Sequence, residues 1–216
     1  MNKRFLLWLV PAVFYAVFVA WYTDFGGPLS DQEVDTFVAI LEERGADPET
    51  VTKLEGFLRN DSGRQFLMLN ALDMNDNPPD VEGAAPGENA DQLIARYMEH
   101  MFPELLKRAS HPVIIGDAVH TVIDVVGIEG AEQWTGGALF RYRSRRTFME
   151  IVSNPAIGGK HEFKLAALEK TIAYPIETTL YFGDPRLVLG LLLLSVTALL
   201  DIALFRPKTR LQGQDQ

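Results

Sequence analysis

The sequence predicts an α+β protein: a four-stranded antiparallel sheet with helices on one face, an N-terminal helical hairpin and two transmembrane helices. Two long apolar runs lie near the ends of the 216-residue chain. Between residues 65 and 178, short apolar runs with strand character alternate with amphipathic segments of helical period. The net charge of −9 argues against a nucleic-acid partner, and the absence of cysteine excludes disulfides, Cys-zinc sites and thiol nucleophiles.

The first apolar run extends from Phe5 to Tyr22 and contains no charged residue. At the helical rise it is about 27 Å long, which is enough to cross a hydrocarbon core. Pro11 is expected to kink this helix, and Trp21 and Tyr22 are typical of the membrane interface. A cleaved signal peptide is the alternative, although the run is longer than a usual signal core and no Ala-x-Ala site follows it. We expect an uncleaved transmembrane helix over residues 5–22.

The second apolar run, residues 187–205, contains Asp201 as its single charged residue. A carboxylate in lipid often marks a partner or an ion path. Asp201 lies about one turn from the basic end of the run, however, where it can reach water or Arg206. We expect a second transmembrane helix, with Asp201 in a structural role.

Basic residues near the ends of the two runs predict their orientation. The tails, residues 1–4 and 206–216, contain five Lys or Arg, whereas residues 23–42 and 167–186 contain two. Both termini are therefore expected in the cytoplasm. Residues 23–186 carry 15 basic and 27 acidic residues, a net charge of −12. We expect these residues in the periplasm and the protein in the cell inner membrane.

The segment from residue 23 to residue 64 predicts a juxtamembrane helical hairpin. Ser30 and Glu33 form a capping box, and the first helix is expected to stop at Gly45. Asp47 followed by Pro48 is typical of the start of a second helix. We expect the hairpin to pack against the main domain; a binding role is the alternative.

Residues 65–180 predict the α+β domain itself. Asn89 and Gln92 form a second capping pair, at the start of a helix that continues to Leu106 with Pro103 bending or restarting it. Ser144 is expected to cap a helix carrying Phe148, and a further helical piece after Gly159 is expected to carry Phe163, Leu165, Leu168 and Glu169. The expected strands are Gln65–Asp73, Val113–Val125, Thr135–Arg143 and Thr171–Thr178. For the second of these, a break at Gly116 or a continuation into a turn is the alternative. This order of elements is the ferredoxin-like βαββαβ arrangement.

Several of these segments resemble the dimeric α+β barrel superfamily. They are Tyr97 with Pro103, the run VIIGDAV, Phe140-Arg141-Tyr142-Arg143-Ser144, Phe148-x-x-Ile151-Val152-Ser153-Asn154-Pro155, and the segment around His161 and Ala166-Ala167. Residues 65–178 look most similar to one member family of unknown function. The resemblance implies sheet-on-sheet dimerisation into a barrel, with a cavity between sheet and helices.

Candidate catalytic residues are few. His120 is expected on a strand face shared with Ile114, Gly116 and Ala118, and it ranks first for proton transfer; a structural imidazole is the alternative. Asn70 and Trp134 can line a pocket, as such residue types do in related enzymes acting on haem or aromatic substrates. The four histidines show neither i, i+4 nor His-x-His spacing, so no metal site is predicted.

The single basic cluster of this acidic domain is the run Arg141, Arg143, Arg145 and Arg146. It can hold an anionic ligand or an acidic partner, or it can form surface salt bridges with the surrounding carboxylates. The ligand-binding candidates are Arg141, Arg143, Tyr97 and Trp134.

The sequence contains no nucleophile elbow, phosphate-binding loop or dinucleotide fingerprint, and we expect no cofactor. The leading hypothesis is a non-catalytic, membrane-anchored extracytoplasmic domain for binding or assembly. Its expected partners are the lipid bilayer and either a second copy of the chain, as a homodimer, or another membrane protein subunit. The alternative is a tethered dimeric α+β barrel enzyme, either cofactor-free or acting on a haem or aromatic substrate.

Overall fold

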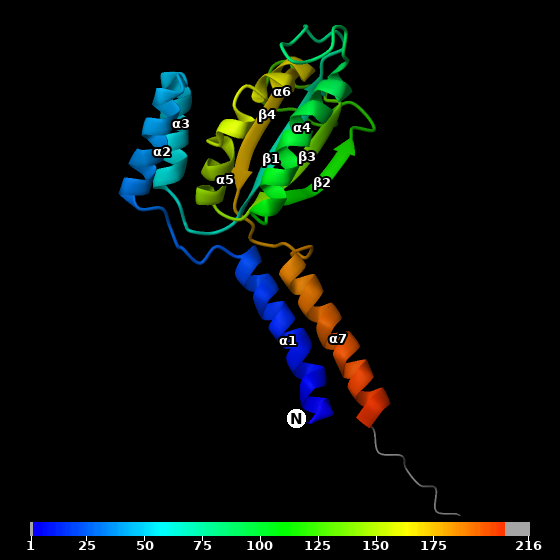
Figure 1. Ribbon diagram of the computed structural model, residues 1–216. Helices are drawn as coiled ribbons and strands as arrows, with labels where there is room; N and C mark the ends of the chain where they lie inside the picture. The colour runs from blue at the N-terminus through cyan, green and yellow to red at the C-terminus, as the bar shows by residue number, and fades with distance from the viewer. Residues whose placement is uncertain (1, 206–216) are drawn as a thin grey trace, which may run out of the picture. The chain divides into compact units, whose positions relative to one another are not determined.

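The computed structural model describes residues 2–205. Within them it shows a four-stranded antiparallel sheet and seven α-helices (Figure 1). The elements are α1 (Lys3–Tyr22), α2 (Asp31–Glu43), α3 (Pro48–Arg59), β1 (Phe66–Met74), α4 (Ala90–Lys107), β2 (His111–Asp117), β3 (Gly136–Tyr142), α5 (Arg145–Val152), the short 3₁₀ helix η1 (Pro155–Ile157), α6 (His161–Ala167), β4 (Leu168–Ile176) and α7 (Pro185–Phe205). The chain forms two compact units: one contains α1 and α7, and the other contains residues 23–178.

The sheet has the strand order β2-β3-β1-β4, and every neighbouring pair is antiparallel. Helix α4 connects β1 to β2, whereas α5, η1 and α6 connect β3 to β4. The register places Leu69 opposite Leu139 on one side and Tyr174 on the other. Side chains alternate between the two faces of a sheet, so Phe66, Met68 and Asn70 belong to the opposite face from Leu69.

The helices between the strands cover the face that carries Phe66. This side chain packs with Met101 and Leu105 of α4 and with Ile151 of α5. A second cluster joins Leu93 and Ala90 of α4 to Phe163 and Ala167 of α6. Burial of these apolar side chains holds α4, α5 and α6 on this face of the sheet.

The hairpin of α2 and α3 packs on α5. Ser30 accepts a hydrogen bond from the Glu33 backbone, and the Glu33 side chain accepts one in return, so the expected capping box is confirmed. Val34 of α2 and Leu58 of α3 are buried against Met149 of α5. The hairpin therefore adds a third apolar contact surface to the unit formed by residues 23–178.

The other face of the sheet is covered only in part. Residues 118–135, between β2 and β3, lie beside this face, and their Val122, Val126 and Ile128 share an open depression with Leu69, Ala71, Ile172 and Tyr174. Ile114 and Tyr174 remain 62% and 47% exposed. An apolar surface of this kind is available for contact with another molecule.

The expected strand Val113–Val125 is confirmed in its first part, and the chain then leaves the strand, as in the alternative that it continues into a turn. Strand β2 ends at Asp117, which lies opposite Gly136, the first residue of β3. Beyond this point β2 has no neighbouring strand to pair with, so the chain leaves the sheet in spite of its strand-forming residues. His120 therefore lies in an exposed loop, and the strand face it was expected to share with Ile114 and Gly116 does not include it.

The last strand also differs from its expected bounds. Residues 168 and 169 were expected in a helix, but α6 ends at Ala167 and β4 extends from Leu168 to Ile176. Strand β1 offers partners as far as Met74, which pairs with Leu168, so sheet pairing continues there. Helix α4, by contrast, continues past Pro103 to Lys107, and its Asn89–Gln92 capping box is confirmed.

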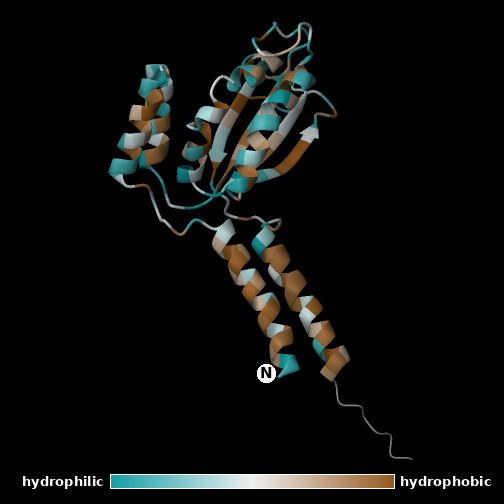
Figure 2. Ribbon diagram, viewed as in Figure 1, coloured by the Kyte–Doolittle hydropathy of each residue, from teal (hydrophilic) through white to brown (hydrophobic). Residues whose placement is uncertain are grey.

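The unit of α1 and α7 is apolar along nearly its whole length (Figure 2). Among the described residues, these two helices are the ones long and apolar enough to cross a membrane, judged by length and composition. Arg4 binds Asp201 through two hydrogen bonds of 2.7 Å. The Tyr15 hydroxyl donates to the Arg186 carbonyl at 3.0 Å. The expected partner Arg206 lies outside the described residues, and Arg4 occupies that role.

Candidate functional site

A cavity of about 200 Å³ lies between α4 and the sheet. Its walls are apolar or aromatic except for one amide and one amine, those of Asn70 and Lys164. The lining residues are Asn70, Leu72, Ile94, Tyr97, Met98, Met101, Phe102, Leu105, Ile115, Ala138, Phe140, Tyr142 and Lys164. Ile115 of β2 is 62% exposed, so the cavity opens to the surface along this strand. Apolar walls with a few convergent polar groups are typical of a small-molecule site.

The polar part of the cavity consists of Asn70 and Lys164. The Asn70 amide nitrogen donates to the Met68 carbonyl at 3.2 Å and lies 3.5 Å from the Ala138 carbonyl. These contacts fix the amide, whose oxygen accepts a hydrogen bond of 3.4 Å from the Lys164 ammonium. No carboxylate is among the lining residues, and burial lowers the pKa of the Lys164 ammonium.

Helix α6 brings Lys164 to this position. Phe163 and Ala167, four residues apart, are buried against α4 and fix the rotation of the helix. Lys164 follows Phe163 directly, so its side chain emerges beside the buried face and reaches the partly buried edge of the cavity. Its ammonium group is thereby held in an apolar environment.

Tyr97 and His161 lie next to each other beside the cavity. Their ring centroids are 6.0 Å apart, with the rings inclined at 70°. Burial raises the pKa of Tyr97 to about 12, and so the phenol is neutral at physiological pH. Desolvation, together with the charge of Lys164, lowers the pKa of His161. The imidazole is thus kept neutral and the phenol protonated.

The cavity offers a few polar groups to a bound molecule. The Tyr97 hydroxyl can donate a hydrogen bond and Lys164 offers an amine, while no carboxylate, serine or histidine is among the lining residues. Within residues 2–205, no group of three or more His, Asp or Glu side chains is arranged to hold a metal ion. The arrangement suits retention of a mainly apolar molecule.

The residues predicted from the sequence divide between this cavity and other places. Asn70 and Tyr97 line it. His120 is exposed, and its ring nitrogen Nδ1 contacts Thr121 of the same loop. Trp134 faces the other side of the sheet, where its ring nitrogen donates to the Ala131 carbonyl at 2.9 Å and Lys170 lies over the ring. The structure therefore does not bring His120 and Trp134 to Asn70.

Arg141 also lies on the sheet face opposite the cavity, in line with Leu67. It is fully buried and donates hydrogen bonds to the Gln65 side chain at 2.8 Å and to the Ala109 carbonyl. Arg143 contacts Thr147 at 3.3 Å. The Arg141 contacts join β3 to the residues that precede β1 and β2, and the Arg143 contact reaches α5.

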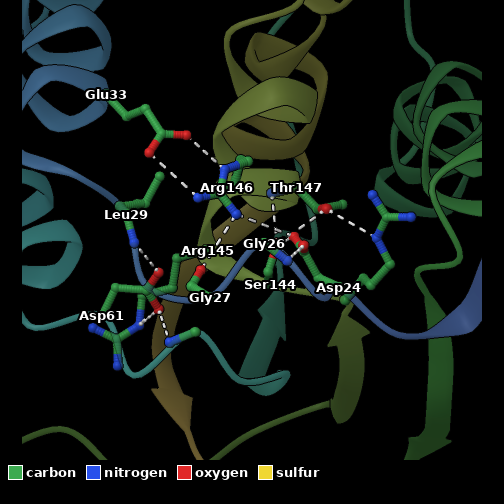
Figure 3. Close-up of polar contacts among 12 residues, drawn as sticks. Asp24, Gly26, Gly27, Leu29, Glu33, Asp61, Ser144, Arg145, Arg146 and Thr147 are labelled. Atoms are coloured by element: carbon green, nitrogen blue, oxygen red, sulfur yellow. Dashed lines mark hydrogen bonds and ion pairs between the residues drawn. The ribbon is translucent and has the colours of Figure 1, made fainter. Parts of the chain in front are cut away.

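The other two arginines of the basic cluster form ion pairs (Figure 3). Arg145 lies 3.4 Å from Asp61 and 2.9 Å from Glu177, and Arg146 lies 2.7 Å from Glu33 and 3.5 Å from Asp24. The Asp61 carboxylate also accepts hydrogen bonds from the backbones of Leu29 and Gly63. This geometry favours the salt-bridge alternative for Arg145 and Arg146. Their charges are already neutralised by four carboxylates, those of Asp24, Glu33, Asp61 and Glu177.

The sequence did not single out Lys164, and it brought in His161 only through the resemblance and as one of the four histidines without metal-ligand spacing. A lysine in a seven-residue helix carries no periodic signal, and most lysines are exposed. The available signal was the pairing of Phe163 with Ala167, which fixes the buried face of α6. Nothing in the sequence, however, indicated that a cavity lies beside that face.

Comparisons with known proteins show likeness in structure only. No protein-family model matches the sequence, and no curated protein matches it. RPA0582, a protein of unknown function from Rhodopseudomonas palustris, is 18% identical, with 62% of this chain and 95% of that one covered and a TM-score of 0.49. For methylated RPA0582 the identity is 18%, the coverage 64% and 95%, and the TM-score 0.50. At3g17210 from Arabidopsis thaliana is 19% identical, covering 54% and 97%, with a TM-score of 0.32. The likeness to methylated RPA0582 concerns the α+β fold alone.

Proposed function

We propose that the chain is a two-span inner-membrane protein whose periplasmic domain binds a small, mainly apolar molecule without transforming it. The single observation that carries the binding role is the cavity between α4 and the sheet, with apolar walls and one polar end. A benzene molecule fills an apolar protein cavity of roughly 150 Å³. The space of about 200 Å³ suits one ring with a small substituent, or a short chain.

Binding is tested with the full chain in lipid nanodiscs, with empty nanodiscs as the blank. Met98 and Met101 line the cavity, so ¹³C-methyl labelling of methionine places reporters inside it. Small aromatic and aliphatic probes are expected to shift these two methyl signals, while Met149, which packs against α2 and α3 outside the cavity lining, serves as the control. Probes at millimolar concentration that leave both signals unmoved would rule out a binding cavity.

The membrane topology rests on the two apolar helices and on the basic residues near their ends. Alkaline phosphatase fused after Gly26 is expected to be active, and fluorescent protein fused there is expected to be dark. Both reporters should behave in the opposite way when fused at the C-terminus. A mature chain that starts near Asp24 would instead establish the signal-peptide alternative.

We also propose that residues 65–178 have the ferredoxin-like topology and pair through their sheets as a homodimer. Support comes from the strand order β2-β3-β1-β4 and from the exposed side chains of Ile114, Ile172 and Tyr174 on the face away from the helices. Tyr174→Glu places a charge on this face and is expected to convert dimers to monomers in light scattering. Glu169→Lys, an exposed change on the same strand, serves as the control.

The alternative, a tethered enzyme of the dimeric barrel type, has one observation in its favour. Three residues with polar side chains, Asn70, Tyr97 and Lys164, line the same cavity. His120 and Arg141, the other residues that such an enzyme was expected to use, lie elsewhere. Mass spectrometry of a bound probe after long incubation distinguishes the two functions. Binding predicts an unchanged probe, whereas catalysis predicts a product that disappears in the Asn70→Leu variant.

A further inference from the structure

We infer that the cavity between α4 and the sheet selects apolar molecules that bear a single carboxylate, with the carboxylate bound by the Lys164 ammonium group. This inference rests on the proposed binding function and narrows it to one ligand class. It is argued from the position of one amine, from the absence of a counter-charge in the cavity walls and from the way Asn70 is held.

Lys164 is the single charged residue of the cavity lining. Among the described residues, no carboxylate lies within ion-pair distance of its ammonium group, in contrast to Lys53 and Lys170, which are paired with Glu49 and Asp73. An amine in apolar surroundings without a counter-charge lowers its free energy when an anion enters. The lowered pKa of Lys164 has this same origin.

Asn70 acts as a positioning residue for the amine. Its nitrogen is engaged by the Met68 and Ala138 carbonyls, so its oxygen, and not its nitrogen, faces Lys164. That oxygen satisfies one of the three donors of the ammonium group and leaves others for a ligand. A carboxylate accepts such hydrogen bonds with charge assistance, which is stronger than acceptance by a neutral amide.

The apolar walls of the cavity determine the chemistry of the rest of the ligand, which must be apolar as well. Ile94, Met98 and Phe102 of α4 face Leu72, Ala138 and Phe140 of the sheet across the cavity. No second charged group lines this space, so a dicarboxylate would bury an unpaired charge. A monocarboxylate with a body of one ring or a short chain satisfies both the charge and the volume.

The test compares pairs of probes with the same shape in the full chain in nanodiscs. The pairs are 4-methylbenzoate with 4-methylbenzamide and hexanoate with hexanamide, followed by the methyl signals of Met98 and Met101. We expect at least one carboxylate to bind about tenfold or more tightly than its amide, the effect of one charge-assisted hydrogen bond. Lys164→Met should abolish this preference while the amide still binds, and Lys164→Arg should retain it.

Two further variants sharpen the test. Asn70→Asp supplies an internal carboxylate beside Lys164 and should weaken carboxylate binding by about tenfold or more, with little effect on the amide. Lys160→Met is the matched control, because Lys160 lies over the Phe163 ring outside the cavity lining and its loss should leave the preference intact.

The outcomes separate this inference from the function it rests on. Equal binding of carboxylate and amide, or a preference that survives in Lys164→Met, would overturn the carboxylate assignment and leave the binding function standing. Failure of all four probes to shift the two methyl signals would overturn both. A preference that is lost in Lys164→Met and kept in Lys160→Met supports both.

Discussion

Arg146 of α5 and Glu33 of α2 form an ion pair of 2.7 Å between side chains 113 residues apart in the sequence. Hydrogen bonds from Arg146, followed by those from Ser30, lower the pKa of Glu33 to about 2. The same carboxylate closes the capping box of α2. One side chain thus fixes both the start of a helix and the contact of that helix with α5.

Glu33→Gln should keep the capping box and lose the ion pair, because glutamine also serves at this helix position. We expect a loss of about 0.5–1 kcal/mol in the free energy of unfolding at neutral pH, since the pair is partly exposed. Denaturant titration of the full chain in detergent measures it. An unchanged stability would show that the ion pair contributes nothing beyond the cap.

The pH dependence follows from the lowered pKa of Glu33. The folded value of about 2 lies below the ordinary value of 4.5, so the carboxylate contributes its full stability above pH 4.5. This contribution should disappear as the pH falls from 4.5 to about 2. The difference in melting temperature between the wild type and Glu33→Gln is therefore expected to shrink across this interval. A difference that stays constant would contradict the assignment.

Arg145→Met should lower the free energy of unfolding more than Lys53→Met, a change at an exposed lysine. The Asp61 side chain is 1% exposed and lies 3.4 Å from Arg145, whose guanidinium also covers the Phe57 ring at 4.5 Å. Removing the cation leaves a buried carboxylate without its charge partner, at a cost of about 3–5 kcal/mol. Lys53→Met, at a side chain that is 71% exposed, should cost less than about 1 kcal/mol. Equal losses for the two variants would contradict the structural role of Arg145.

Gly63→Ala and Gly56→Ala should change stability in opposite directions. Gly63 has φ +72°, and a Cβ there would lie 2.6 Å from the Gly27 and Pro28 backbones, so alanine is expected to destabilise by more than 1 kcal/mol. Gly56 lies inside α3 with open space around it, and alanine should stabilise the helix by about 0.5–1 kcal/mol. Thermal unfolding of the two variants gives the comparison.

Arg4→Gln should reduce the amount of folded protein in membranes more than the double variant Arg4→Gln/Asp201→Asn does. The single change leaves the Asp201 carboxylate, which is 9% exposed, without its cation. In the proposed membrane setting, a lone carboxylate costs a few kcal/mol, whereas an amide pair carries no net charge there. Quantitative immunoblotting of membrane fractions measures the yields, and equal yields would show that the pair is dispensable.

Local signals in the sequence predicted local structure well. Ser30 with Glu33 and Asn89 with Gln92 are capping boxes in the structure, since both partners of each lie three residues apart. The end of β2 was not predictable in this way, because it depends on where β3 begins to offer hydrogen bonds. His120 was consequently placed on a strand that does not reach it.

The candidate site was predictable only in part, for a similar reason. Asn70 was singled out by its residue type and Tyr97 through the resemblance to the dimeric α+β barrel superfamily, and both line the cavity. Lys164 approaches Asn70 across 94 residues of chain, and its helix is too short for a periodic pattern. The carboxylate partners of Arg145 and Arg146 were likewise undetermined, because they depend on the packing of α2 and α3 against α5.

The ion pairs between the α2–α3 hairpin and α5 impose an order on biosynthesis. Glu33 leaves the ribosome long before Arg146, and at common elongation rates the interval across their 113 residues is roughly 6–23 s. During this time the apolar side chains of Val34 and Leu58 lack the Met149 surface that buries them. The apolar side chains of the newly synthesised hairpin therefore stay accessible to chaperones and proteases until α5 has been synthesised.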